Sequence, residues 1–175
     1  MKYIQGTIAL PLILSINKPV NIKWYFDAAF VVHKYKRSHT GGFITMGTVW
    51  LYVNSSKQKL NTNISTDANI VGVDYVLTNV IWTWYFLKDQ GYKIYDNIIY
   101  QDNQSAIKLD KNYRKSRRKG TRQINTRYYF ITDWITKQEA SVELCPTLDI
   151  IGDYFTKALQ ESQLIRFLNI IIGIH

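Results

Sequence analysis

The stretch "IIYQDNQSAIKLD", Ile98 to Asp110, indicates how this chain folds. An apolar run ends at Gln101-Asp102-Asn103, and residues that favour a helix follow at once. This pattern predicts a buried strand with a carboxylate at its C-terminal end, beside the start of a helix. A carboxylate at the edge of a core costs free energy unless something binds it. Because ligands of open α/β sheets lie at the carboxyl ends of strands, Asp102 is a candidate ligand-binding residue.

The composition predicts one packed domain with a basic surface. The chain has 175 residues, of which 46% are hydrophobic and 14% aromatic, enough for a substantial core. Its 22 Lys and Arg against 13 Asp and Glu give a net charge of +9, which favours a polyanion, nucleic acid above all, or an anionic membrane surface. The alternative is a basic protein with no such partner.

Three further features limit the compartment and the covalent chemistry. Cys145 is the single cysteine, so no disulfide forms within the chain, and we expect a small buried hydrophobe. The apolar run Ile8 to Ile16 contains Pro11 and lacks the flanks and cleavage site of a signal peptide. It and the C-terminal run Phe167 to Ile174 are shorter than the roughly 20 residues of a membrane span. We therefore expect no membrane association.

Hydrophobic periodicity predicts an alternation of strands and helices. Strands are expected over Ile22–Val32, Phe43–Met46, Val49–Val53, Asn97–Asp102 and Ala140–Pro146, and longer helices over Ser65–Leu87, Ile124–Gln138 and Leu148–Leu159. With a short helix after Asp102, the order is β-β-β-α-β-α-α-β-α. Helical crossovers imply parallel strands beside an antiparallel meander, so the fold class is α/β, an α+β mixed sheet.

Some local features carry more specific expectations. The stretch His33 to Gly42 is expected to be a basic turn closed by glycines. Ser65 or Thr66 is expected to cap the long helix, and Gly91 to stop it. Trp82 and Trp84 on that helix are expected to lie in the core.

Three aspartates stand out as candidate metal ligands. Asp27 is embedded in the first expected strand, Asp102 ends the fourth, and Asp153 lies in the last expected helix. Mg²⁺ prefers oxygen ligands, and carboxylates scattered in sequence commonly converge to hold it. Two such ions, roughly 3.5–4 Å apart, stabilise both the attacking and the leaving oxygen in phosphodiester cleavage. From the residue types alone, a chance set of exposed acids is the better explanation.

Six stretches follow one another in the order and at the intervals of a known family: WYFDAAF, RSHTGGFITMG, SSKQKLNTNISTDAN, YQDNQSAIKL, INTRYYFITD and GDYFTKAL. Together they resemble the ribonuclease H domain at the C-terminal end of copia-type retrotransposon Pol polyproteins, which also contain a reverse transcriptase. The resemblance implies a ribonuclease H-like fold, a five-stranded mixed sheet with helices on both faces. It also implies an endonuclease that hydrolyses the RNA strand of RNA–DNA hybrids with two Mg²⁺ ions.

The same resemblance implies a setting for the domain. Residues 1–20 resemble the tail of the reverse-transcriptase connection, and 21–175 would be the ribonuclease H-like domain. The implied partners are an RNA–DNA hybrid or other nucleic acid and the rest of the Pol polyprotein, with no membrane. The implied location is a cytoplasmic virus-like particle, with the nucleus as a second location.

The family holds its metal ions with an Asp, Glu, Asp, Asp set, and one of the four is missing here. Asp27, Asp102 and Asp153 fall on the three Asp positions, but the family's STEAE-like motif reads STDAN, so that Asn69 stands at the Glu position. An amide offers a neutral oxygen in place of a charge. Asp67 is two residues away, a turn of about 200° along a helix, and points elsewhere. We expect weakened metal binding and a rate lower by roughly a hundredfold or more.

A basic segment from Lys111 to Tyr128 is the candidate nucleic-acid contact. Its eight cationic residues are Lys111, Arg114, Lys115, Arg117, Arg118, Lys119, Arg122 and Arg127. Lys and Arg neutralise phosphates and release counterions, which gives salt-sensitive affinity without sequence preference. A solvated basic loop and a nuclear-localisation signal are the alternatives.

Three other functional assignments stay open at this point. The domain could bind nucleic acid without turnover, or it could be a non-functional retroelement relic. An integrase-like relative of the same fold is a weaker alternative, because the DYFTKAL ending does not suit it.

Overall fold

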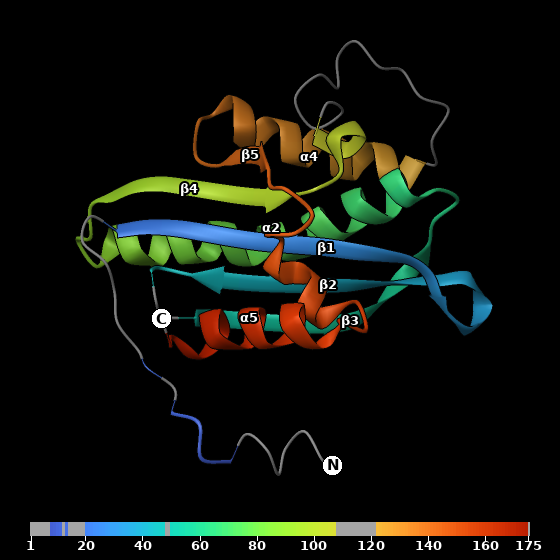
Figure 1. Cartoon of the computed structure of the whole chain (residues 1–175). Helices are drawn as coiled ribbons and strands as arrows, with labels where there is room; N and C mark the ends of the chain where they lie inside the picture. Colours follow the sequence, from blue (N-terminus) through green and yellow to red (C-terminus); the bar gives the residue numbers. More distant parts are fainter. Residues whose placement is uncertain (1–7, 12, 14–19, 48–49, 108–121, 175) are drawn as a thin grey trace.

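The computed structural model describes residues 8–11, 13, 20–47, 50–107 and 122–174, without the side chains of 122–125 and 128. Figure 1 shows the elements along the chain. They are β1 (Val20–His33), η1 (Lys34–Lys36), β2 (Arg37–Thr45), β3 (Trp50–Asn61), α2 (Ser65–Asp89), β4 (Ile94–Gln101), α4 (Arg122–Thr136), β5 (Ser141–Leu144), η3 (Ile151–Phe155) and α5 (Glu161–Ile172). A short helical turn, 104–107, follows β4.

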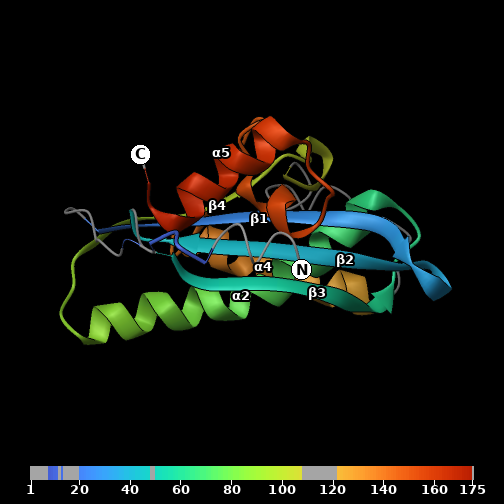
Figure 2. The same ribbon diagram turned by 60° about the horizontal axis from the view of Figure 1, so that its bottom comes forward.

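The five strands form one mixed sheet in the order β3-β2-β1-β4-β5. The pairs β1–β2 and β2–β3 are antiparallel, whereas β1–β4 and β4–β5 are parallel. Helices α2 and α4 cover one face of the sheet, and η3 and α5 cover the other (Figure 2). The predicted five-stranded mixed sheet with helices on both faces is therefore confirmed.

The alternation of side chains along β1 divides the core into two layers. Ile22, Trp24 and Phe26 are fully buried in the larger core, which α2 shares. Tyr25 points to the other face and packs with the smaller cluster around Phe43, under η3 and α5. Because side chains two residues apart share a face of a strand, Asp27 lies on the η3 side with Tyr25.

Helix α2 has the predicted apolar face, but its start differs from the prediction. Val73, Val76 and Val80 are buried against the sheet, as expected. The N-cap residue is Ile64, without a side-chain cap, so the prediction of a Ser65 or Thr66 cap was wrong: both residues already have helical geometry. The helix ends at Asp89, and Gly91 follows with a φ of +82°, in line with the predicted stop.

In length and composition α2 would suffice to cross a membrane. Half of its most apolar window is buried inside the molecule, where the helix packs on the sheet. A core helix of this kind passes the same test, so its apolarity is explained by the fold.

The predicted basic turn from His33 to Gly42 was wrong over most of its length. Only η1 forms a turn, and β2 begins at Arg37. Ser38 and Thr40 are buried in β2. Thr62 shares a hydrogen bond with the Ser38 hydroxyl, and the Gln58 amide donates to Thr40. The paired sheet therefore satisfies polar side chains that a sequence pattern assigns to a loop.

Two expectations in the helices were also wrong. The region predicted as a last helix, Leu148–Leu159, contains only η3, and the helix proper is α5. The backbone N–H groups of Thr156 and Lys157 both bond to the Asp153 carbonyl, which closes the turn and ends it. Trp82 is 64% exposed rather than buried, because it lies on the outer side of α2.

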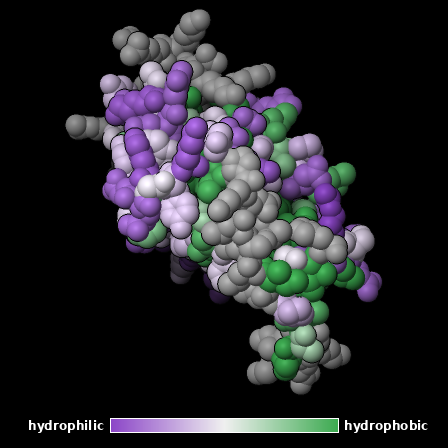
Figure 3. Space-filling view, turned by 90° about the vertical axis from the view of Figure 1, so that its left-hand side faces the viewer, coloured by the Kyte–Doolittle hydropathy of each residue, from purple (hydrophilic) through white to green (hydrophobic). Residues whose placement is uncertain are grey.

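At the end of the sheet where β1 begins and α2 ends, apolar side chains line a hollow. Met46, Phe86, Leu87 and Tyr92 line it together with Val20, and the ring of Trp82 stacks on Phe86. Figure 3 views the molecule from this side and shows hydrophobic and hydrophilic areas next to each other. Asp102 lies beyond the opposite end of β4, so this hollow takes no part in the carboxylate site.

We predict that Gly72→Ala destabilises the protein, although the same change stabilises most helices. A Cβ at Gly72 would lie 2.2 Å from the ring of Phe26, which is fully buried in the core. Overpacking of this kind costs about 1–3 kcal/mol, measured as the free energy of unfolding in urea.

Thr78→Ala, at an exposed position of the same helix, is the control and should change stability by less than about 0.5 kcal/mol. In a Phe26→Leu background the penalty of Gly72→Ala should shrink. An undiminished penalty would show that the ring is not the obstacle.

Candidate metal centre

Three carboxylates from different elements converge on one face of the sheet. Asp27 lies in β1, Asp102 directly follows β4, and Asp153 lies in η3. Each offers a ligand oxygen, and the three oxygens lie within 4.8 Å of one another. The structure thus brings together the three aspartates that the sequence analysis selected as metal ligands.

The parallel register of β1 and β4 places the first two carboxylates level with each other. Tyr25 pairs with Tyr100 across the two strands, and the two rings stack with centroids 5.2 Å apart. Two residues further along each strand stand Asp27 and Asp102, on the same face as the tyrosines. The strand pairing itself therefore brings these carboxylates together.

Two glycines let η3 approach the sheet closely enough to add Asp153. A Cβ at Gly152 would lie 2.6 Å from the backbone nitrogen of Asp27, and a Cβ at Gly41 would lie 2.7 Å from the Gly152 carbonyl oxygen. Phe155 then stacks on Phe43, and its carbonyl accepts a 2.8 Å hydrogen bond from the Ser55 hydroxyl. Contacts to β1, β2 and β3 thus fix η3.

Thr156 and Lys157, which follow η3, bind the carboxylates directly. The Thr156 hydroxyl donates to Asp27 Oδ2. Lys157 Nζ lies 2.8 Å from Asp153 Oδ1 and 3.7 Å from Asp27 Oδ1. Neither residue is among the site residues predicted from the sequence. The four-residue spacing of Asp153 and Lys157 was the available signal, since such pairs meet on one side of a helical turn.

Burial and repulsion from like charges raise the pKa values of Asp102 and Asp153. Burial, with the like charges of Asp27 and Asp102, raises the pKa of Asp153 to about 6, against the lowering effect of its hydrogen bond to Lys157. Burial and the charge of Asp27 raise the pKa of Asp102 as well. The pKa of Lys157 is raised: burial lowers it, but the hydrogen bond to Asp153 and the nearby carboxylates outweigh burial. The cluster is thus short of positive charge.

Asn69 lies near the start of α2 and is 4% exposed. Its Nδ2 donates to the Ser65 carbonyl at 3.1 Å. Its Oδ1 is buried and has no hydrogen-bond partner in the part of the chain that the structure describes. A buried acceptor without a donor costs free energy. The three converging aspartates are the kind of oxygen donors that a hard divalent cation such as Mg²⁺ takes, so these residues fit the ion. The place of Asn69 as a fourth ligand stays a prediction.

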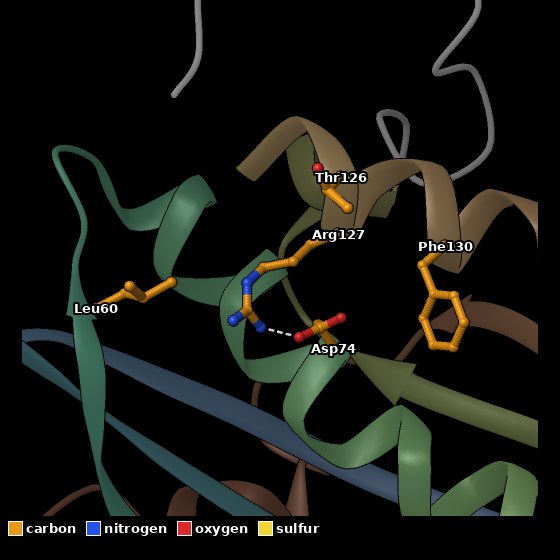
Figure 4. A pocket seen from close by; sticks show the side chains of 5 residues that line it. All are labelled: Leu60, Asp74, Thr126, Arg127 and Phe130. Atoms are coloured by element: carbon orange, nitrogen blue, oxygen red, sulfur yellow. Dashed lines mark ion pairs between the residues drawn. The ribbon is translucent and has the colours of Figure 1, made fainter. Parts of the chain in front are cut away.

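The predicted nucleic-acid contacts are only partly visible. Lys111, Arg114, Lys115, Arg117, Arg118 and Lys119 lie outside the described residues, as does the side chain of Arg122. Arg127, in α4, forms an ion pair with Asp74 of α2 at a cavity of about 450 Å³. Figure 4 shows the guanidinium directed at that carboxylate. Its charge is therefore used within the fold, and its contact with nucleic acid stays a prediction.

Comparison with known proteins supports the family resemblance. No family model matches the chain. It is 26% identical, over its whole length, to the retrovirus-related Pol polyprotein from transposon TNT 1-94 of Nicotiana tabacum, and spans 13% of that polyprotein.

Solved structures share the fold at much lower identity. An RNase H1 isolated from compost matches 73% of this chain and 85% of its own, with a TM-score of 0.54 and 12% identity. The N-terminal RNase H domain of a Mycobacterium tuberculosis protein matches 78% of this chain and 91% of its own, with a TM-score of 0.53 and 11% identity.

The chain has a ribonuclease H-like fold. It is distantly homologous to the copia-type Pol polyprotein. The division of the chain into a connection segment, residues 1–20, and a ribonuclease H-like domain, 21–175, stays a prediction.

We predict that the metal-free domain loses stability as pH rises from about 4 to 6. The native pKa of Asp153 is about 6, and the unfolded value is about 3.9, so the native state binds more protons in this window. Since a pKa difference of one corresponds to about 1.4 kcal/mol, the ionised Asp153 costs the fold about 3 kcal/mol above pH 6. Urea unfolding in EDTA across this range measures the slope.

Asp153→Asn is the control and should make the stability depend less on pH. Only a smaller loss of stability with rising pH, which Asp102 contributes, should remain. A parent whose stability rises with pH over the same window would contradict the raised pKa.

Proposed function

We propose that this domain hydrolyses the RNA strand of RNA–DNA hybrids, at a rate reduced by Asn69. The convergence of Asp27, Asp102 and Asp153 within 4.8 Å carries the proposal. The homology to a retrotransposon Pol polyprotein supports it, as does the shared fold of RNase H domains. We propose in addition that the domain acts as part of a Pol polyprotein, in cytoplasmic virus-like particles with the nucleus as a second location.

Each side chain has a distinct part in this proposal. Asp27, Asp102 and Asp153 would hold two Mg²⁺ ions. When bound, the ions stabilise the attacking and leaving oxygens of phosphodiester hydrolysis. Thr156 donates to Asp27 Oδ2 and so helps to fix the orientation of that carboxylate. The neutral Oδ1 of Asn69 would complete the set less well than a Glu, because it adds no charge against the ions.

A second candidate function follows from the same residue. With a neutral amide at the fourth position, the domain could bind hybrids through the basic segment without cleaving them. Such a binding module would have an affinity that falls steeply with salt and does not depend on Mg²⁺. Cleavage by the parent protein therefore decides between the two.

We predict that Asn69→Glu raises the rate of hybrid cleavage by about a hundredfold or more, because it restores a charged ligand. The measurement is single-turnover cleavage of a labelled RNA–DNA hybrid in Mg²⁺. Asn79→Glu adds the same charge to α2 ten residues away and should leave the rate unchanged, while Asp102→Asn in the Asn69→Glu background should abolish cleavage.

Detectable cleavage by the parent supports the enzyme, and cleavage by Asn69→Glu alone supports the binding module. Equal rates in parent and Asn69→Glu would contradict the assignment of Asn69 to the fourth position. Cleavage that survives Asp102→Asn would remove the carboxylate cluster from the mechanism.

We predict that the double variant Arg117→Gln/Arg118→Gln binds hybrids more weakly and with a shallower salt dependence. Each lost phosphate contact should reduce the slope of log K against log salt by about 1, measured by fluorescence anisotropy between 50 and about 200 mM salt. Lys88→Gln/Lys93→Gln, with one lysine in the last turn of α2 and one directly before β4, lowers the net charge equally and serves as the control. If both double variants lose the same affinity, the overall charge rather than the basic segment governs binding.

A further inference from the structure

Lys157 differs from the other charged residues near the carboxylates because its ammonium pairs with two carboxylates at once. Its ammonium lies 2.8 Å from Asp153 Oδ1 and 3.7 Å from Asp27 Oδ1. Both carboxylates are nearly inaccessible, whereas the Lys157 side chain is 39% exposed. The cation therefore enters the cluster from the solvent side.

A matched pair elsewhere in the chain shows what is unusual about Lys157. Lys137 and Asp133 have the same four-residue spacing, and their Nζ–Oδ2 distance is 2.7 Å. Both side chains of that pair are exposed, so its contribution to stability is small. The partner of Lys157 is buried and lies beside two further carboxylates, so Lys157 neutralises charge that water does not reach.

The carboxylate that Lys157 holds is one that a metal ion would need. Asp153 accepts from the ammonium at Oδ1 and is one of the three carboxylates that converge within 4.8 Å. An ammonium and a divalent cation on one carboxylate repel each other strongly in a partly buried site. The long flexible stem of lysine allows the ammonium to move into solvent.

We propose that Lys157 is a positioning residue that takes the place of a divalent cation in the metal-free centre and leaves Asp153 when metal binds. It thereby holds the three carboxylates together without metal and sets the metal concentration at which the centre fills. This role rests on the proposed metal-dependent function, and it concerns the affinity for metal rather than the cleavage step.

The test measures Mn²⁺ binding by isothermal titration calorimetry, and thermal unfolding in EDTA, on the whole 175-residue chain. Lys157→Met keeps the volume of the side chain and removes its charge, and we expect it to bind Mn²⁺ about tenfold more tightly. The same variant should unfold at a lower temperature than the parent in EDTA, because its carboxylates lose their cation.

Lys157→Arg keeps the charge and should resemble the parent in both measurements. Lys137→Met removes the matched surface lysine and should leave Mn²⁺ affinity unchanged. If Lys157→Met does not fold, Lys157→Gln provides an uncharged side chain that still donates to Asp153. A purely structural lysine would lower the unfolding temperature without tightening Mn²⁺ binding.

Unchanged or weaker Mn²⁺ binding in Lys157→Met, with binding lost in Asp102→Asn, overturns the role of Lys157 and leaves the proposed function standing. If neither the parent nor Lys157→Met binds Mn²⁺, both proposals fail. Tight binding in Lys157→Met and weak binding in the parent and Lys157→Arg is the expected result.

Discussion

The structure depends on holding three like charges together at a partly buried site. The carboxylates of Asp27, Asp102 and Asp153 lie within 4.8 Å of one another, and like charges at that distance disfavour ionisation. The strand register fixes the first two, so only the third has to be brought in against repulsion. Gly41 and Gly152 permit the approach, and the docking of η3 on the sheet offsets the repulsion. The fold accepts this cost in stability at one place, where the proposed chemistry requires negative charge.

The parts of this arrangement that could be predicted from sequence are those with a regular period. The apolar run before Asp102 and the apolar face of α2 follow simple rules, and the mixed sheet follows from the order of the elements. The position of Asp102 could be inferred from strand ends alone. Asp27 and Asp153 needed the family resemblance, because nothing in their local sequence distinguishes them from other acids. Asp27 and Asp153 converge because η3 is a short turn. The helical spacing of its apolar residues predicts a longer helix instead.

The incorrect expectations have a common physical origin, which is that local patterns do not include the neighbouring layer. Ser38 and Thr40 resemble loop residues until β3 and the segment that follows it supply their hydrogen-bond partners. Trp82 resembles a core residue until its place on the outer side of α2 is known. Lys157 was passed over for the same reason. Its spacing from Asp153 is ordinary, and only the second carboxylate, brought by β1, makes it unusual.

In the proposed metal centre, with Asn69 at the fourth position, the charge balance links Asn69 to Lys157. Three carboxylates with one ammonium leave two negative charges, which match a single divalent cation. A Glu at position 69 would add a third negative charge, which Asn69 does not. The ammonium therefore neutralises a larger share of the charge here than it would in a four-carboxylate centre, and it competes more effectively with metal. When Lys157 leaves, the three negative charges of the aspartates are still fewer than the four positive charges of two divalent ions. We therefore expect a first ion to bind more tightly than a second. The charge missing at position 69 mainly weakens binding of the second ion, because the ligands must also offset the repulsion between that ion and the first.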